Sequence, residues 1–72
     1  MDQEKLNIER ASKAIRDSRF VEGLSFLESN LSKDPNHKDS LYLAAVCSRY
    51  LKNYKDSKEY LNNLLIQAPD MG

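Results

Sequence analysis

One spacing constrains this 72-residue chain more than any other feature of its sequence: the pattern of residues 19–35 returns 34 positions later, in residues 53–69. The aligned pairs are Phe20 with Tyr54, Glu22 with Asp56, Gly23 with Ser57, Phe26 with Tyr60, Leu27 with Leu61, Leu31 with Leu65, and Pro35 with Pro69. A period of this length is typical of stacked supersecondary units, each unable to bury its apolar face alone.

In both stretches the apolar and small positions fall at helical spacing, which predicts two amphipathic helices. The predicted inner faces are Phe20, Gly23, Leu24, Leu27 and Leu31 in the first, and Tyr54, Ser57, Leu61, Leu64, Leu65 and Ala68 in the second.

The segments before these two stretches are also predicted to be helical. Before the second stretch, one face carries Leu41, Ala44, Ala45, Ser48 and Leu51. We expect Asn36 to cap that helix after the break at Pro35. The earlier helix is marked more weakly, by Ala11, Ala14 and Ile15.

Small residues stand where the two helices of each unit would cross, Ala11 with Gly23 and Ala45 with Ser57. Helix axes about 8 to 10 Å apart require a small side chain on at least one side. Glycine inside a helix costs roughly 0.5 to 1 kcal/mol relative to alanine, so Gly23 predicts a close approach. A merely tolerated glycine is the alternative.

The 34-residue period, the small residues at the crossings, the aromatic residues at 20 and 54 and the closing prolines resemble the tetratricopeptide repeat over residues 4–69. The resemblance implies an all-α fold of two stacked helix-turn-helix hairpins, a short right-handed α-solenoid of about four helices. The chain would be one domain, 1–72, with repeat one at 4–37 and repeat two at 38–71. Asn7 and Arg10 depart from the family pattern, which favours large apolar residues there; a polar outer side or a frayed first helix would explain them.

Composition disfavours several classes of partner. Eleven basic and eleven acidic residues cancel, so no net field attracts nucleic acid or an anionic membrane. The single cysteine, Cys47, forms no internal disulfide, the N-terminus lacks an apolar signal region, and the longest apolar run is only residues 41–47. We expect a cytoplasmic protein that binds neither nucleic acid nor membrane.

The residues that carry chemistry do not form a catalytic pattern. Cys47 and His37, if on one helix, stand about 15 Å apart along its axis, too far for a nucleophile–base pair. We expect Cys47 in a helix contact and His37 exposed in a first turn. One cysteine and one histidine supply no metal-binding pair, and there is no Gly-rich phosphate loop. The sequence predicts no enzyme, no cofactor and no metal.

The resemblance implies a concave groove lined by the first helix of each repeat. The residues on that side are Lys5, Ile8, Ser12, Arg16, Asp39, Tyr42, Val46, Arg49 and Tyr50. Tyrosine anchors near arginine suit the burial of a peptide or helix; the alternative is that the tyrosines merely cover their helix. A branch of the family clamps chaperone carboxylates, but Ile8, Ser12 and Leu43 replace its lysine and asparagines, so we expect no such clamp.

Three functions follow as hypotheses. The leading one is a protein-interaction module that binds a peptide or partner helix; the others are an N-terminal repeat arm of a larger enzyme, such as a transferase, and a self-associating structural unit. Repeat arrays generally need three or more units. We therefore expect the chain to be the N-terminal piece of a longer protein, or else to self-associate through a partly uncovered C-terminal face of Leu43, Cys47, Leu64 and Leu65.

Overall fold

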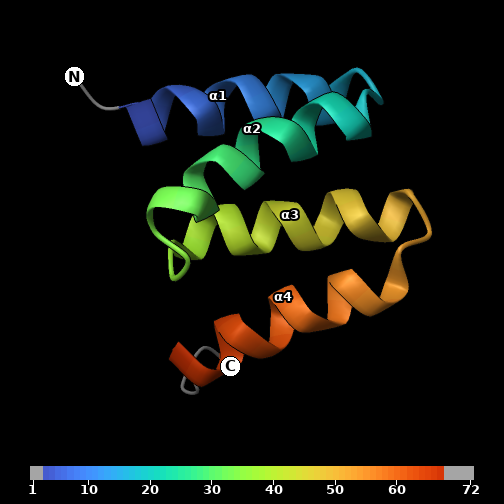
Figure 1. Ribbon diagram of the computed structural model, residues 1–72. Helices are drawn as coiled ribbons and strands as arrows, with labels where there is room; N and C mark the ends of the chain where they lie inside the picture. Colours follow the sequence, from blue (N-terminus) through green and yellow to red (C-terminus); the bar gives the residue numbers. More distant parts are fainter. Residues whose placement is uncertain (1–2, 68–72) are drawn as a thin grey trace.

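The computed structural model describes residues 3–67, which form four α-helices joined by short turns. The helices are α1 (Gln3–Arg16), α2 (Phe20–Lys33), α3 (Lys38–Tyr50) and α4 (Tyr54–Gln67). They follow one another in a stack, with α2 packed against both α1 and α3, and α3 against α4 (Figure 1). The predicted all-α fold of two helical hairpins is confirmed. Ala68 and Pro69, which the repeat pattern includes, lie outside the described residues.

The 34-residue period is reproduced in the backbone of the two hairpin turns. In the first turn, the N–H groups of Ser18 and Arg19 donate to the carbonyls of Ile15 and Ala14, at 3.0 and 2.7 Å. The second turn repeats both bonds 34 residues later, from Lys52 to Arg49 at 3.0 Å and from Asn53 to Ser48 at 2.8 Å. This pair of bonds ends a helix with one residue in the left-handed conformation.

That left-handed residue is Ser18 in the first turn, with φ of 63°, and Lys52 in the second, with φ of 65°. Glycine usually occupies such a position because a Cβ there is strained by about 1 to 2 kcal/mol. Both turns therefore carry the same strain at equivalent places, which shows that the two units share backbone geometry where their side chains differ.

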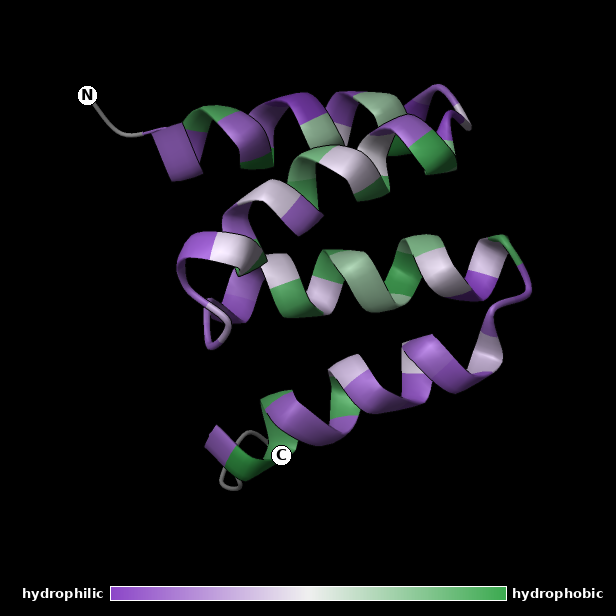
Figure 2. Ribbon diagram, in the orientation of Figure 1, coloured by the Kyte–Doolittle hydropathy of each residue, from purple (hydrophilic) through white to green (hydrophobic). Residues whose placement is uncertain are grey.

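The core lies where α1, α2 and α3 meet. Ala11, Leu27, Ala44 and Cys47 are fully buried there. Around them pack the partly buried residues Ile8, Ile15, Leu24, Phe26, Leu31, Leu43 and Tyr60. Figure 2 agrees with this placement, because α3 carries hydrophobic residues along much of its length while α1 is mostly hydrophilic. The core therefore depends on contacts between helices of both hairpins.

Both predicted close crossings are present. A Cβ placed on Gly23 would lie 3.4 Å from the carbonyl oxygen of Ala11. At the equivalent crossing, the Ser57 hydroxyl donates to the carbonyl of Ala45 at 3.0 Å. Since 3.4 Å is an ordinary van der Waals distance, the first crossing is close but has room for alanine at position 23.

The predicted inner face of α4 is only partly correct. Ser57 and Leu64 are buried, but Tyr54, Leu61 and Leu65 are exposed. Their counterparts on α2 are covered by α3, whereas no helix of residues 3–67 follows α4 to cover it in the same way.

The expectation that Cys47 and Leu64 lie uncovered at the C-terminal end was wrong, because both are buried. Cys47 packs in the core against Leu27, between α2 and α3. Leu64 is 5% exposed. Leu43 is partly buried, and Leu65 alone of the predicted end face is exposed.

The start of α3 differs from the prediction. His37, and not Asn36, is the N-cap: its Nδ1 accepts a hydrogen bond from the Ser40 backbone N–H at 3.3 Å. The backbone N–H of Asn36 instead donates to Asp34 Oδ1 at 3.2 Å. Polar residues did not fray the first helix, since α1 is helical from residue 3. None of the helices in residues 3–67 has both the length and the apolarity needed to cross a bilayer.

Candidate functional site

A chain of buried polar side chains joins the first three helices. Asn7 of α1 donates from Nδ2 to Asn30 Oδ1 of α2 at 2.9 Å. The Asn30 amide nitrogen donates in turn to Ser40 Oγ of α3 at 3.0 Å and to the backbone oxygen of Glu4 at 3.1 Å. Ser40 Oγ lies 2.6 Å from His37 Nδ1. These bonds fix the start of α3 against α1 and α2.

The direction of the last bond follows from the cap. Because His37 Nδ1 accepts the Ser40 backbone N–H, it carries no proton in this arrangement, and the Ser40 hydroxyl also donates to it. His37 is therefore half-buried and held in place, not the exposed first-turn residue that the sequence predicted. It faces a hollow between α1 and the start of α3.

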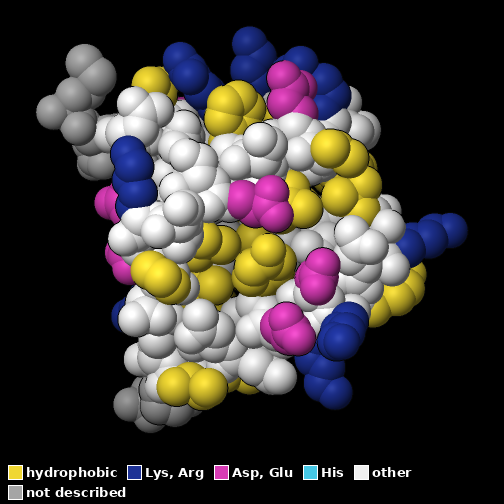
Figure 3. All heavy atoms as spheres, viewed as in Figure 1, with side chains coloured by type: hydrophobic (Ala, Val, Ile, Leu, Met, Phe, Trp, Pro, Cys, Tyr) yellow, Lys and Arg dark blue, Asp and Glu magenta, His cyan; other side chains and the backbone are white. Residues whose placement is uncertain are grey.

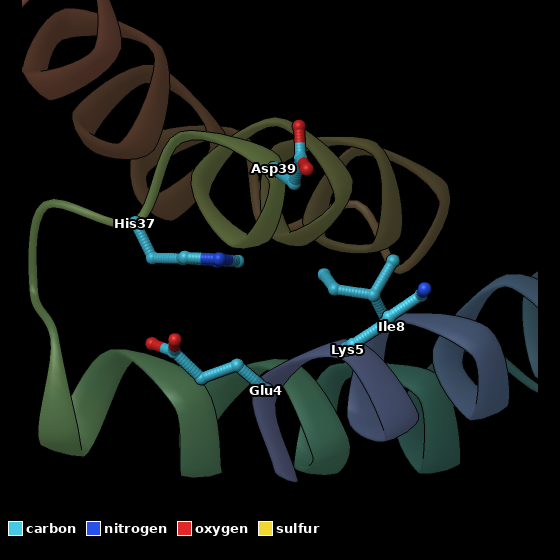
Figure 4. A pocket seen from close by; sticks show the side chains of 5 residues that line it. All are labelled: Glu4, Lys5, Ile8, His37 and Asp39. Carbon is cyan, nitrogen blue, oxygen red and sulfur yellow. The ribbon is translucent and has the colours of Figure 1, made fainter. Parts of the chain in front are cut away.

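This first hollow, of about 310 Å³, is lined by Glu4, Lys5, Ile8, His37 and Asp39. Three of them, Lys5, Ile8 and Asp39, belong to the predicted groove. The side chains of Glu4 and His37 extend toward one another across the space between α1 and the start of α3 (Figure 4). Two carboxylates and one lysine give this end of the surface a mixed, net negative lining.

A second hollow, of about 490 Å³, lies at the other end of α3. Its lining residues are Tyr42, Val46, Arg49, Tyr50, Lys52 and Tyr54. The first four belong to the predicted groove, while Lys52 and Tyr54 were missed because they lie outside the first helix of the repeat. Arg49 and Lys52 are its charged lining residues, so this hollow is positive, with three tyrosines beside them.

The two hollows are connected by one face of α3. Asp39, Tyr42, Val46 and Arg49 are spaced by three, four and three residues, which places them on a single stripe. The stripe is about 15 Å long at 1.5 Å per residue. Tyr42, at its middle, is 57% exposed. Of the other predicted residues, Ser12 is half-buried and Arg16 exposed, and neither lines a hollow.

Tyr50 has a structural contact besides its place in the second hollow. Its ring stacks on that of Phe20 from α2, with centroids 4.5 Å apart and planes 6° from parallel. Such aromatic pairs contribute about 0.5 to 1.5 kcal/mol beyond the area they bury. Replacing Tyr50 would therefore weaken the packing of α3 on α2, and Tyr42 is the cleaner residue for testing binding.

The reactive side chains are poorly placed for catalysis. Burial raises the pKa of the Cys47 thiol, which disfavours the thiolate. Ser40 and His37 have the distance of a nucleophile–base pair, but Ser40 is fully buried and its oxygen accepts the Asn30 amide. Within residues 3–67, no three His, Cys, Asp or Glu side chains are grouped so that they could hold a metal ion.

Comparison with known proteins gave no match among family models, curated proteins or solved structures.

Proposed function

We propose that this chain is a protein-interaction module, built from two units like tetratricopeptide repeats, that binds a segment of a partner protein along the exposed face of α3. The observation that carries the proposal is the continuous stripe from Asp39 to Arg49, with a hollow at each end and Tyr42 exposed between them. Exposed tyrosine beside arginine is the composition typical of binding hot spots. We place this activity in the cytoplasm.

The charges of the two hollows define which way a partner segment would lie. Glu4 and Asp39 line one hollow, and Arg49 and Lys52 line the other, about 15 Å away along α3. Complementary potentials fix orientation and suppress wrong partners. The bound segment would therefore place a basic end near Asp39, an apolar or aromatic residue on Tyr42 and Val46, and an acidic end near Arg49.

Selection from a display library of random twelve-residue peptides tests this proposal. We expect enriched peptides with an acidic end and an aromatic centre. Tyr42→Ala should abolish their binding while leaving the circular dichroism spectrum and urea midpoint nearly unchanged, since Tyr42 lies mostly in solvent.

A charge pair gives the matched control. Lys52→Glu should weaken binding of the acidic peptides at least several-fold, whereas Lys55→Glu, an exposed lysine three residues away that lines neither hollow, should not. Peptides that bind the Tyr42→Ala and Lys52→Glu variants as well as the unmodified protein would refute the assignment of this surface.

A further inference from the structure

One stripe of α4 is uncovered although its counterpart on α2 is packed. We call Tyr54, Lys58, Leu61 and Leu65 the α4 stripe; 34 residues earlier stand Phe20, Leu24, Leu27 and Leu31. On the α4 stripe, Tyr54 is 63%, Leu61 40% and Leu65 55% exposed. Figure 3 shows hydrophobic side chains at the surface near the lower end of the molecule, where α4 ends.

The packing of α2 shows what covers a stripe of this kind. Phe20 stacks on Tyr50 of α3, and Leu27 is fully buried in one cluster with Ala44 and Cys47, also of α3. Leu24 and Leu31 pack against the same cluster. The covering element is thus an antiparallel helix with an aromatic residue at one end and small residues at its centre.

Lys58 changes the chemistry of the covering helix. It takes the place of Leu24, which on α2 packs against the core. Covering an ammonium group without a partner costs several kcal/mol, so a helix that covers the α4 stripe must bring a carboxylate. We propose that the α4 stripe docks an amphipathic helix of another protein, which carries an acidic residue opposite Lys58 and an aromatic residue near Tyr54.

A second copy of this chain fits the stripe poorly. Its α1, laid on α4 as α3 lies on α2, would bring Lys13, the counterpart of Cys47, beside Lys58. Two α4 helices paired antiparallel through their stripes would place both Lys58 side chains within about one turn of each other. Like charges face one another in both arrangements, which favours a different protein as the occupant.

A helical probe made from the chain's own α3 tests the proposal. The probe is a synthetic peptide of residues 38–51, held helical by a staple on its solvent side, with Cys47→Glu; the control peptide carries Cys47→Lys. Position 47 is chosen because Cys47 and Leu24 pack in the same cluster in the natural α2–α3 contact. Titration is followed by amide chemical shifts of the labelled full chain.

We expect the glutamate peptide to shift amides around Lys58, Leu61 and Leu65, and to bind at least several-fold more tightly than the lysine peptide. Lys58→Glu in the protein should invert this preference. Lys55→Glu, an exposed lysine of α4 outside the stripe, should leave the preference unchanged.

Three results would overturn the proposal: no shifts on α4 at millimolar peptide, a preference that Lys58→Glu leaves intact, or sedimentation showing a dimer that Leu65→Glu dissociates. The last result would assign the stripe to a second copy. Because Lys58, Leu61 and Leu65 line neither hollow beside α3, failure here leaves the proposed groove untouched, and failure of the groove peptides leaves this stripe untouched.

Discussion

In the first hairpin, the buried contact near the open end of the helices is polar: Asn7 of α1 donates to Asn30 of α2. In the second hairpin the same two places, 34 residues later, hold Leu41 and Leu64, which are also buried. The backbone turns of the two hairpins match bond for bond. One geometry is therefore filled in two ways, by a hydrogen-bonded amide pair and by an apolar pair.

The difference follows from what lies next to each contact. Asn30 also donates to Ser40 Oγ and to the Glu4 carbonyl, so both protons of its amide group are used at the junction of three helices. A buried polar group is tolerable when all of its hydrogen bonds are made. Leu64 contributes to the α3–α4 contact, where an apolar side chain is sufficient.

The largest predicted effect comes from converting half of the polar contact into the apolar one. Asn30→Leu should destabilise the protein by about 1 to 3 kcal/mol, because it strands the buried Asn7 amide. The double variant Asn7→Leu/Asn30→Leu, which copies the second hairpin, should recover most of that loss. Urea unfolding measures both. A double variant less stable than the sum of its single substitutions would contradict the equivalence of the two contacts.

A second test compares two serines of the second hairpin. Ser57 donates to the Ala45 carbonyl, so Ser57→Ala should cost about 1 kcal/mol. Ser48 Oγ is buried and has no partner in the described part of the chain, so Ser48→Ala should leave stability equal or raise it. Equal losses from the two substitutions, measured by thermal and urea unfolding, would show that the crossing bond adds nothing.

At the corresponding crossing of the first hairpin, Gly23→Ala should stabilise the protein by about 0.5 to 1 kcal/mol. A Cβ there meets Ala11, Ile15 and Ala14 at 3.4 to 3.5 Å, which are ordinary contacts, while alanine favours the helix. A shift of the urea midpoint reports the gain. Destabilisation of more than about 1 kcal/mol would mean that the first crossing is tighter than the second.

The smallest effect is on pH dependence and is confined to the second hairpin. Burial, with Glu28, Asp56 and Glu59 nearby, raises the pKa of Tyr60 above its ordinary 10.0, and burial raises the pKa of Cys47 above 9.0. The unfolded chain then loses these protons at lower pH than the folded one. The stability involved is complete below the ordinary values and declines as pH rises through the folded ones.

The counterpart of Tyr60 in the first hairpin is Phe26, which does not titrate. Tyr60→Phe should therefore reduce the fall in stability between neutral pH and about pH 10 to 11, leaving only the share of Cys47. Urea unfolding across that range measures the slope. An unchanged slope would place the titrating group elsewhere.

The sequence predicted the helices and crossings well because they repeat. The alignment of Phe20 with Tyr54 and of Gly23 with Ser57 located the helix starts and the close contacts without any structure. Seven of the nine predicted groove residues also line one of the two hollows, although binding itself stays a prediction.

Other features depend on pairs that are distant in sequence. Asn7 was interpreted as a departure from an apolar pattern because its partner, Asn30, lies 23 residues away. The signal that could have found the pair is that both asparagines align with leucines of the second unit. Likewise, the pattern of α4 identified an apolar stripe but not whether another helix covers it, since period alone does not specify neighbours.

The central claim, that one hairpin geometry occurs twice, is tested most directly by nuclear Overhauser contacts in solution. We expect contacts from the Gly23 α-protons to the Ala11 and Ala14 side chains, and matching contacts from the Ser57 β-protons to Ala45, together with contacts between the rings of Phe20 and Tyr50. Contacts at one crossing and not at the other would contradict the claim.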